Sequence, residues 1–77
     1  MVITQEKYTA LMPLIQTLPG FSGTTIHNNN FTLKFSFYSG FACCISSNTK
    51  NTTLAVHFEN QQNDEVAFLT IMNAING

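Results

Sequence analysis

Two runs near the middle of the chain alternate between apolar and polar residues. In residues 31–38 four phenylalanine or leucine side chains occupy every second position, and residues 52–58 repeat this alternation. Successive side chains of a strand point to opposite faces, so a period of two predicts strands with one apolar face. The residues expected to face the core are Phe31, Leu33, Phe35, Phe37, Leu54, Val56 and Phe58.

Two further strands are expected on either side of residues 31–38. Residues 21–27 form the first strand of the chain, with Ile26 directed at the core. Residues 41–47 form the third, because apolar side chains again recur with a period of two. The inward residues of this third strand are Phe41, Cys43 and Ile45.

Short polar segments join these four strands. Residues 28–30 are three asparagines, which tolerate the left-handed backbone of tight turns. Ser39-Gly40 and residues 48–51 provide two more turns. Parallel pairing would need long crossovers, so the short turns predict an antiparallel meander.

The N-terminal segment shows the spacing of an amphipathic helix. Between Thr4 and Leu18 apolar residues recur at i, i+3, i+4 and i+7. Pro13 interrupts this segment, and a proline inside a helix removes a backbone hydrogen bond. We therefore expect a kink, or two helical pieces that meet near Met12, and an end at Pro19-Gly20.

A second helix is expected at the C-terminal end. Asn63 or Asp64 can cap it, and Glu65 places a negative charge at the positive end of the helix dipole. Its apolar residues follow helical spacing and predict one buried stripe. The stripe comprises Val66, Phe68, Leu69, Ile71, Met72 and Ile75.

These elements predict a single α+β domain over residues 1–77, in the order α-β-β-β-β-α. Both helical stripes and the apolar sheet face can be buried together when the helices pack on one face of the four-stranded sheet, which gives two layers. The opposite face is expected to stay open and to carry one charge. Its residues are Thr25, His27, Thr32, Lys34, Ser36, Tyr38, Ala42, Cys44, Ser46, Thr53, Ala55 and His57.

Charge excludes some function classes. Charged residues make up 9% of the chain, against about 25% in typical domains. Three lysines without any arginine cannot form the basic surface that nucleic-acid binding requires, so no direct nucleic-acid partner is expected. No apolar run approaches the ~20 residues of a membrane span, and no signal sequence is evident. A cytoplasmic location without membrane contact is the expectation.

The chain offers few residues for metal or covalent chemistry. The two histidines and Cys43-Cys44 are the soft ligands, and they lack the short loop spacings typical of zinc sites. We therefore predict no metal site and no cofactor; the candidates, were a metal to bind, are His27, His57 and Cys44. A cysteine nucleophile needs a nearby base and an orienting third group, which the sequence does not indicate, so the protein is predicted not to be an enzyme.

The open face directs the functional prediction. A sheet surface with so few charges is poorly protected against association. We expect a protein-interaction module, an adaptor or inhibitor, that binds a partner protein or its own copy through this face or an exposed edge strand. The alternative is binding of a small ligand or metal on the same face. The residues predicted to bind the partner are Thr25, His27, Lys34, Ser36, Tyr38, Ala55 and His57.

Size and composition add one resemblance. A chain of 77 residues with so few charges resembles the small accessory proteins of phages and mobile elements, including inhibitors of bacterial defence such as anti-CRISPR proteins. The resemblance is one of type, and it assigns no role to individual residues.

Overall fold

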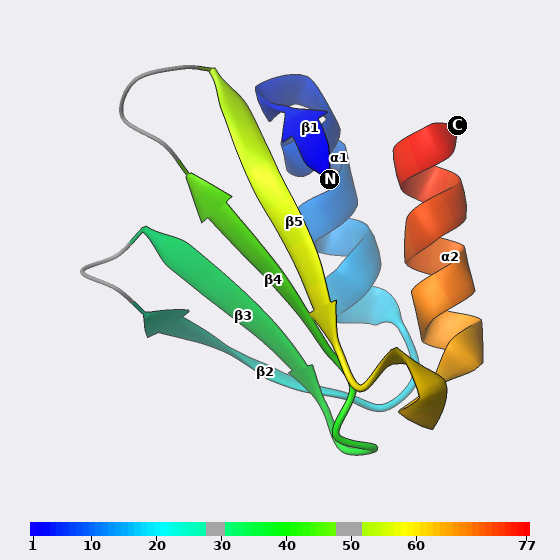
Figure 1. Cartoon of the computed structure of the whole chain (residues 1–77). Helices are drawn as coiled ribbons and strands as arrows, with labels where there is room; N and C mark the ends of the chain where they lie inside the picture. Colours follow the sequence, from blue (N-terminus) through cyan, green and yellow to red (C-terminus); the bar gives the residue numbers. More distant parts are fainter. Residues whose placement is uncertain (28–30, 48–51) are drawn as a thin grey trace.

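The structure is a computed structural model that describes residues 1–27, 31–47 and 52–77 (Figure 1). The turns expected at residues 28–30 and 48–51 lie outside these ranges. Within them the elements are β1 (Val2–Thr4), α1 (Gln5–Thr17), β2 (Phe21–His27), β3 (Thr32–Phe37), β4 (Ala42–Ser47), β5 (Thr53–Glu59), a 3-10 turn (Gln61–Asn63) and α2 (Glu65–Asn76).

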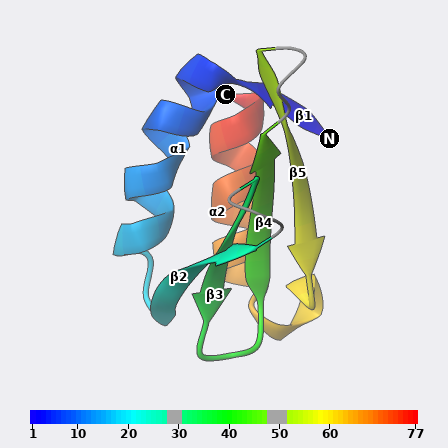
Figure 2. The ribbon, with the colours of Figure 1, turned by 90° about the vertical axis from the view of Figure 1, so that its left-hand side faces the viewer.

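The strands form one antiparallel sheet in the order β1-β5-β4-β3-β2. Strands β2 to β5 follow one another as a meander, and both helices lie on one side of the sheet (Figures 1 and 2). The predicted α+β class and two-layer arrangement are confirmed. The strand count of four is wrong, because β1 also joins the sheet through pairs such as Ile3 with Leu54. Three residues are too few to show a period of two, so this strand depends on its pairing with β5.

Helix α1 is continuous through Pro13. Thr4 caps it, since its side-chain oxygen accepts a hydrogen bond from the Lys7 backbone N–H at 3.1 Å. The predicted division into two pieces near Met12 is wrong. Pro13 and Thr9 are both exposed, so the Thr9 carbonyl that the proline leaves without its helical donor lies on the solvent side of the helix.

Helix α2 begins as predicted. The Asp64 side chain accepts a hydrogen bond from the Ala67 backbone N–H at 3.1 Å. At the other end, Lys7 Nζ of α1 donates to the carbonyl oxygens of Ala74 at 3.2 Å and of Gly77 at 3.0 Å. This places a cation at the negative end of the α2 dipole and ties the two helices together.

The hydrophobic core lies between the helices and the sheet. The inward residues predicted for β4 and β5 are buried or half-buried, and the same holds for three of the four predicted around β3. Aromatic rings meet within this core, as where Phe58 and Phe68 pack edge to face with centroids 5.0 Å apart. The buried residues of this core are Ile3, Leu11, Ile15, Phe35, Phe37, Phe41, Cys43, Ile45, Leu54, Val56, Ala67 and Ile71.

Four residues predicted to be buried are instead exposed. Ile26 and Phe31 are 60% and 46% exposed, and Val66 and Leu69 on α2 are 77% and 54% exposed. Ile26 pairs with Leu33 and shares its side of the sheet, but the end of β2 extends away from both helices (Figure 1). On α2 the buried stripe is narrower than predicted and centres on Ile71, because only one side of the helix contacts other elements.

None of the helices in the described ranges is both long and apolar enough to span a membrane.

Candidate functional site

The register of the sheet aligns side chains in rows across its open face. One row runs through Thr25, Lys34, Cys44 and His57, because each is the cross-strand partner of the next. Cross-strand partners share a face of the sheet and their side chains lie close enough to interact. Glu59 is the last residue of β5 and lies two residues after His57, so its side chain projects from the same face. The central part of the face is therefore built from polar residues of β3, β4 and β5.

These residues line an open hollow of about 320 Å³ on the face opposite the helices. Within the hollow, the Thr32 and Ser46 hydroxyl oxygens lie 2.9 Å apart. The lining residues are His27, Thr32, Lys34, Cys44, Ser46, His57 and Glu59.

An ion pair crosses the middle of this hollow. Lys34 Nζ lies 2.9 Å from Glu59 Oε1, and the two residues stand on β3 and β5 with β4 between them. Cys44 is the residue of β4 at this level, and it is only 7% exposed although it faces away from the helices. The reach of Lys34 to Glu59 across β4 accounts for the cover over the Cys44 thiol.

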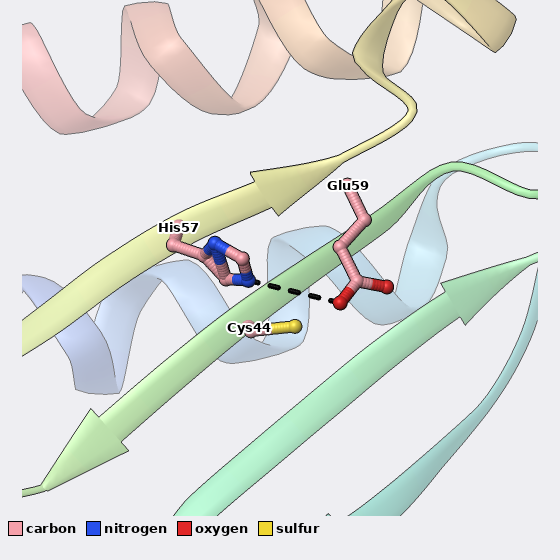
Figure 3. A group of neighbouring side chains, drawn as sticks. All are labelled: Cys44, His57 and Glu59. Atoms are coloured by element: carbon pink, nitrogen blue, oxygen red, sulfur yellow. Dashed lines mark ion pairs between the residues drawn. The ribbon is translucent and has the colours of Figure 1, made fainter.

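Cys44, His57 and Glu59 bring three different ligand types together (Figure 3). The nearest donor atoms of the three side chains all lie within 4.8 Å of one another. His57 Nε2 is 3.7 Å from Glu59 Oε2. The three residues could hold a metal ion.

Electrostatics in the hollow favour a charged Glu59 and Lys34 and a neutral Cys44. The hydrogen bond from Lys34 lowers the pKa of Glu59, and the same bond raises the pKa of Lys34. Burial raises the pKa of the Cys44 thiol, and the nearby Glu59 carboxylate raises it further. On the other face, burial raises the pKa of Cys43 to about 12. Both thiols are therefore protonated near neutral pH.

This arrangement does not resemble an activated cysteine nucleophile. Reactive cysteines lie beside positive charge that stabilises the thiolate. Here the carboxylate of Glu59 opposes ionisation of Cys44, even though Lys34 acts in the other direction. Ionisation of the Cys44 thiol is therefore disfavoured at this position.

Six of the seven residues predicted to bind a partner lie on strands of the open face, in β2 (Thr25, His27), β3 (Lys34, Ser36) and β5 (Ala55, His57). The seventh, Tyr38, lies in the turn after β3 and is 83% exposed. The structure brings Lys34 and His57 into the hollow with His27.

Glu59 is absent from the open-face residues predicted from the sequence. Glu59 is the last residue of β5 and continues the alternation of Ala55 and His57, which is the signal that could have placed it. The expectation of a single charge on the open face is therefore wrong. The three residues named from the sequence as metal candidates do not all lie together. His57 and Cys44 lie with Glu59, whereas His27 Nε2 is 2.9 Å from Thr25 Oγ1 and lies outside the cluster.

The edge strand β2 is a second exposed feature. The Phe37 backbone N–H donates to Phe41 and the Phe31 carbonyl accepts from Ser47, so odd-numbered residues of β3 bond to β4. Even-numbered residues of β3 therefore bond to β2, and backbone groups alternate in direction along a strand. Thr24 and Ile26 pair with odd-numbered residues, so their backbone N–H and C=O groups point outward from the sheet.

Comparison with protein-family models, with curated protein sequences and with solved structures finds no match to this chain.

Proposed function

We propose that this chain is a protein-interaction module that accepts a strand of a partner protein along the edge strand β2. The observation that carries this proposal is a seven-residue edge without a charged residue or proline, on which Ile26 is 60% exposed. A partner strand that pairs with such an edge gains backbone hydrogen bonds, and side-chain contacts supply specificity.

The two edges of the sheet differ in how well they are protected. Natural proteins block edge strands with lysine, proline, bulges or very short strands. The β1 edge is only three residues long. Strand β2 has a register shift between Phe21 and Gly23, but regular pairing continues from there to His27. The half of β2 from Thr24 to His27 is thus the part of the sheet edge best suited to a new strand.

The edge also suggests which partner strand fits. A strand added beside β2 would meet Ile26 on the helix side of the sheet and Thr25 and His27 on the open side. An uncharged strand with alternating apolar residues complements this surface. The partner is another protein or a second copy of the chain, and the role is that of a cytoplasmic adaptor or inhibitor rather than an enzyme. An inhibitor of a defence system, such as an anti-CRISPR protein, is the class that size and composition resemble.

Introducing a positive charge on the edge tests the proposal. We expect Ile26→Lys to abolish binding, because a lysine on an edge strand disfavours pairing with another strand. Val66→Lys is the matched control, since Val66 is also an exposed β-branched apolar residue and lies on α2, 77% exposed. Native mass spectrometry of the purified chain reports a second copy. Quantitative capture from the source cells with wild type and both variants as baits reports any other partner.

The outcome separates edge binding from other modes. A partner or dimer that is lost with Ile26→Lys and kept with Val66→Lys supports strand addition at β2. Equal binding by all three proteins contradicts it. A fourth bait with Tyr38→Glu and Ala55→Glu tests the predicted open-face residues, and loss of binding with this bait alone would transfer the partner site from the edge to the open face.

A further inference from the structure

We propose that Cys44, His57 and Glu59 form a binding site for a zinc ion on the open face of the sheet, with Lys34 as the group that the metal displaces. The site uses residues of β4 and β5 and does not depend on strand addition at β2.

Backbone geometry holds the three ligands in place. Cys44 and His57 are direct cross-strand partners in the β4–β5 ladder. Glu59 lies two residues beyond His57 on the same strand, so its side chain projects from the same face. Sites built on paired strands hold their ligands more accurately than sites built on loops. Two consecutive strands thus bring the three ligands into one cluster.

The distances are close to those of a metal site. Zinc binds sulfur at about 2.3 Å and nitrogen or oxygen at about 2.0–2.2 Å, so ligand atoms around it lie roughly 3.3–3.7 Å apart in a tetrahedron. The donor atoms here lie within 4.8 Å of one another. The side chains of His57 and Glu59 are 65% and 39% exposed. Rotation about their side-chain bonds can therefore move each donor atom by the ~1 Å that this coordination requires.

Charge balance also favours a divalent ion. A Cys44 thiolate and the Glu59 carboxylate together neutralise Zn²⁺, and the thiol proton passes to solvent as the metal binds. Without metal, the ammonium group of Lys34 lies 2.9 Å from Glu59 Oε1 and supplies the positive charge. Lys34 therefore competes with the metal for the same carboxylate.

The ligand set selects the type of metal. Sulfur and imidazole nitrogen with one carboxylate suit zinc and similar transition metals, whereas Mg²⁺ and Ca²⁺ prefer oxygen ligands alone. Three protein ligands leave a fourth position, which faces the hollow that His27 and Ser46 also line. Zinc sites with three protein ligands bind water or substrate at such a position.

Metal titration of the purified chain tests the site. After treatment with a chelator, Co²⁺ is added and absorbance is recorded, and the affinity for Zn²⁺ is measured by competition with a chromophoric chelator. We expect one metal per chain and a thiolate-to-cobalt charge-transfer band. The band is expected to disappear in Cys44→Ser. Circular dichroism and thermal unfolding without metal establish that each variant is folded.

Four further variants make the test specific. His57→Ala and Glu59→Gln are expected to weaken Zn²⁺ binding at least about ten-fold, the lower end of what loss of even an outer-shell partner costs. His27→Ala is the matched control, a histidine of the same hollow outside the cluster, and should change affinity less than about two-fold. Lys34→Gln should tighten binding roughly two- to five-fold, because exposed ion pairs are weak competitors.

The opposite results would overturn the site. Absence of Zn²⁺ binding, or equal binding by wild type, His57→Ala and Glu59→Gln, contradicts it. A loss of Zn²⁺ affinity in His27→Ala as large as the loss in His57→Ala contradicts the proposed ligand set. Weaker binding by Lys34→Gln contradicts the displacement of Lys34. Cys44→Ser and His57→Ala act through different ligands, so failure of one variant to fold leaves the other as a test.

Discussion

Cys43 and Cys44 are neighbours in sequence, yet they lie on two faces of the sheet that exclude water in different ways. Cys43 is fully buried in the apolar core beneath the helices, where burial raises its pKa to about 12. Cys44 is almost as well covered, 7% exposed, but its neighbours are the polar residues Lys34, His57 and Glu59. One thiol is covered by hydrocarbon and the other by an ion pair.

This comparison shows that burial has two different consequences in the same strand. On the helix side, the core contains no buried charged or polar side chain among the described residues. On the open side, the cover is made by side chains that can move, since Lys34 and Glu59 are 33% and 39% exposed. The first face stabilises the fold, and the second can exchange its cover for a ligand.

The largest expected difference between the faces comes from aromatic truncation. Phe35→Ala should lower the free energy of unfolding by about 3–5 kcal/mol, because a fully buried ring leaves a cavity between the helices and the sheet. Tyr38→Ala removes a ring that is 83% exposed and should change it by less than about 0.5 kcal/mol. Urea denaturation followed by circular dichroism measures both. Similar losses would mean that the core does not lie where the structure places it.

The same substitution in the two adjacent cysteines gives a smaller but sharper contrast. Cys43→Ser buries a hydroxyl group in the apolar core and should cost about 1–3 kcal/mol. Cys44→Ser places the hydroxyl beside Lys34 and Glu59, which can both bond to it, and should cost less than about 1 kcal/mol. Urea denaturation of the two variants checks this order. A reversed order would contradict the assignment of the faces.

The smallest effect concerns the ion pair over Cys44. The pKa of Glu59 is lower in the folded chain than its ordinary value of 4.5, so its contribution to stability is complete above that value and is lost as pH falls through the lower folded pKa. Glu59→Gln should therefore flatten the decline in unfolding free energy below about pH 4.5 relative to wild type. The pKa of Lys34 is raised above 10.5, so its contribution is complete below that value and is lost as pH rises further.

Denaturation of wild type and Glu59→Gln across this acid range is the measurement. Other carboxylates titrate there in both proteins, so the difference between the two curves isolates Glu59. Curves with the same slope would show that the contact with Lys34 does not stabilise the fold.

The sequence determined most of the secondary structure. The alternation in residues 31–38 and 52–58 and the helical spacing near Ile15 and Ile71 identify elements because burial of one face imposes a period. Asp64 was identifiable as a helix cap, because capping is a local interaction. The α+β class and the position of both helices on one face followed from the apolar stripes of the helices and the apolar face of the sheet, because these can all be buried together.

Tertiary structure decided how far each element is covered and which polar residues meet. Ile26 and Val66 fit the apolar pattern, but their exposure depends on where the helices end and which side of α2 makes contact. Strand β1 exists through pairing with β5, a contact between distant segments. The cluster of Cys44, His57 and Glu59 depends on the register of β4 against β5, because a shift of one residue would send every side chain to the other face. A pattern along one strand specifies its faces, whereas register between strands determines neighbours.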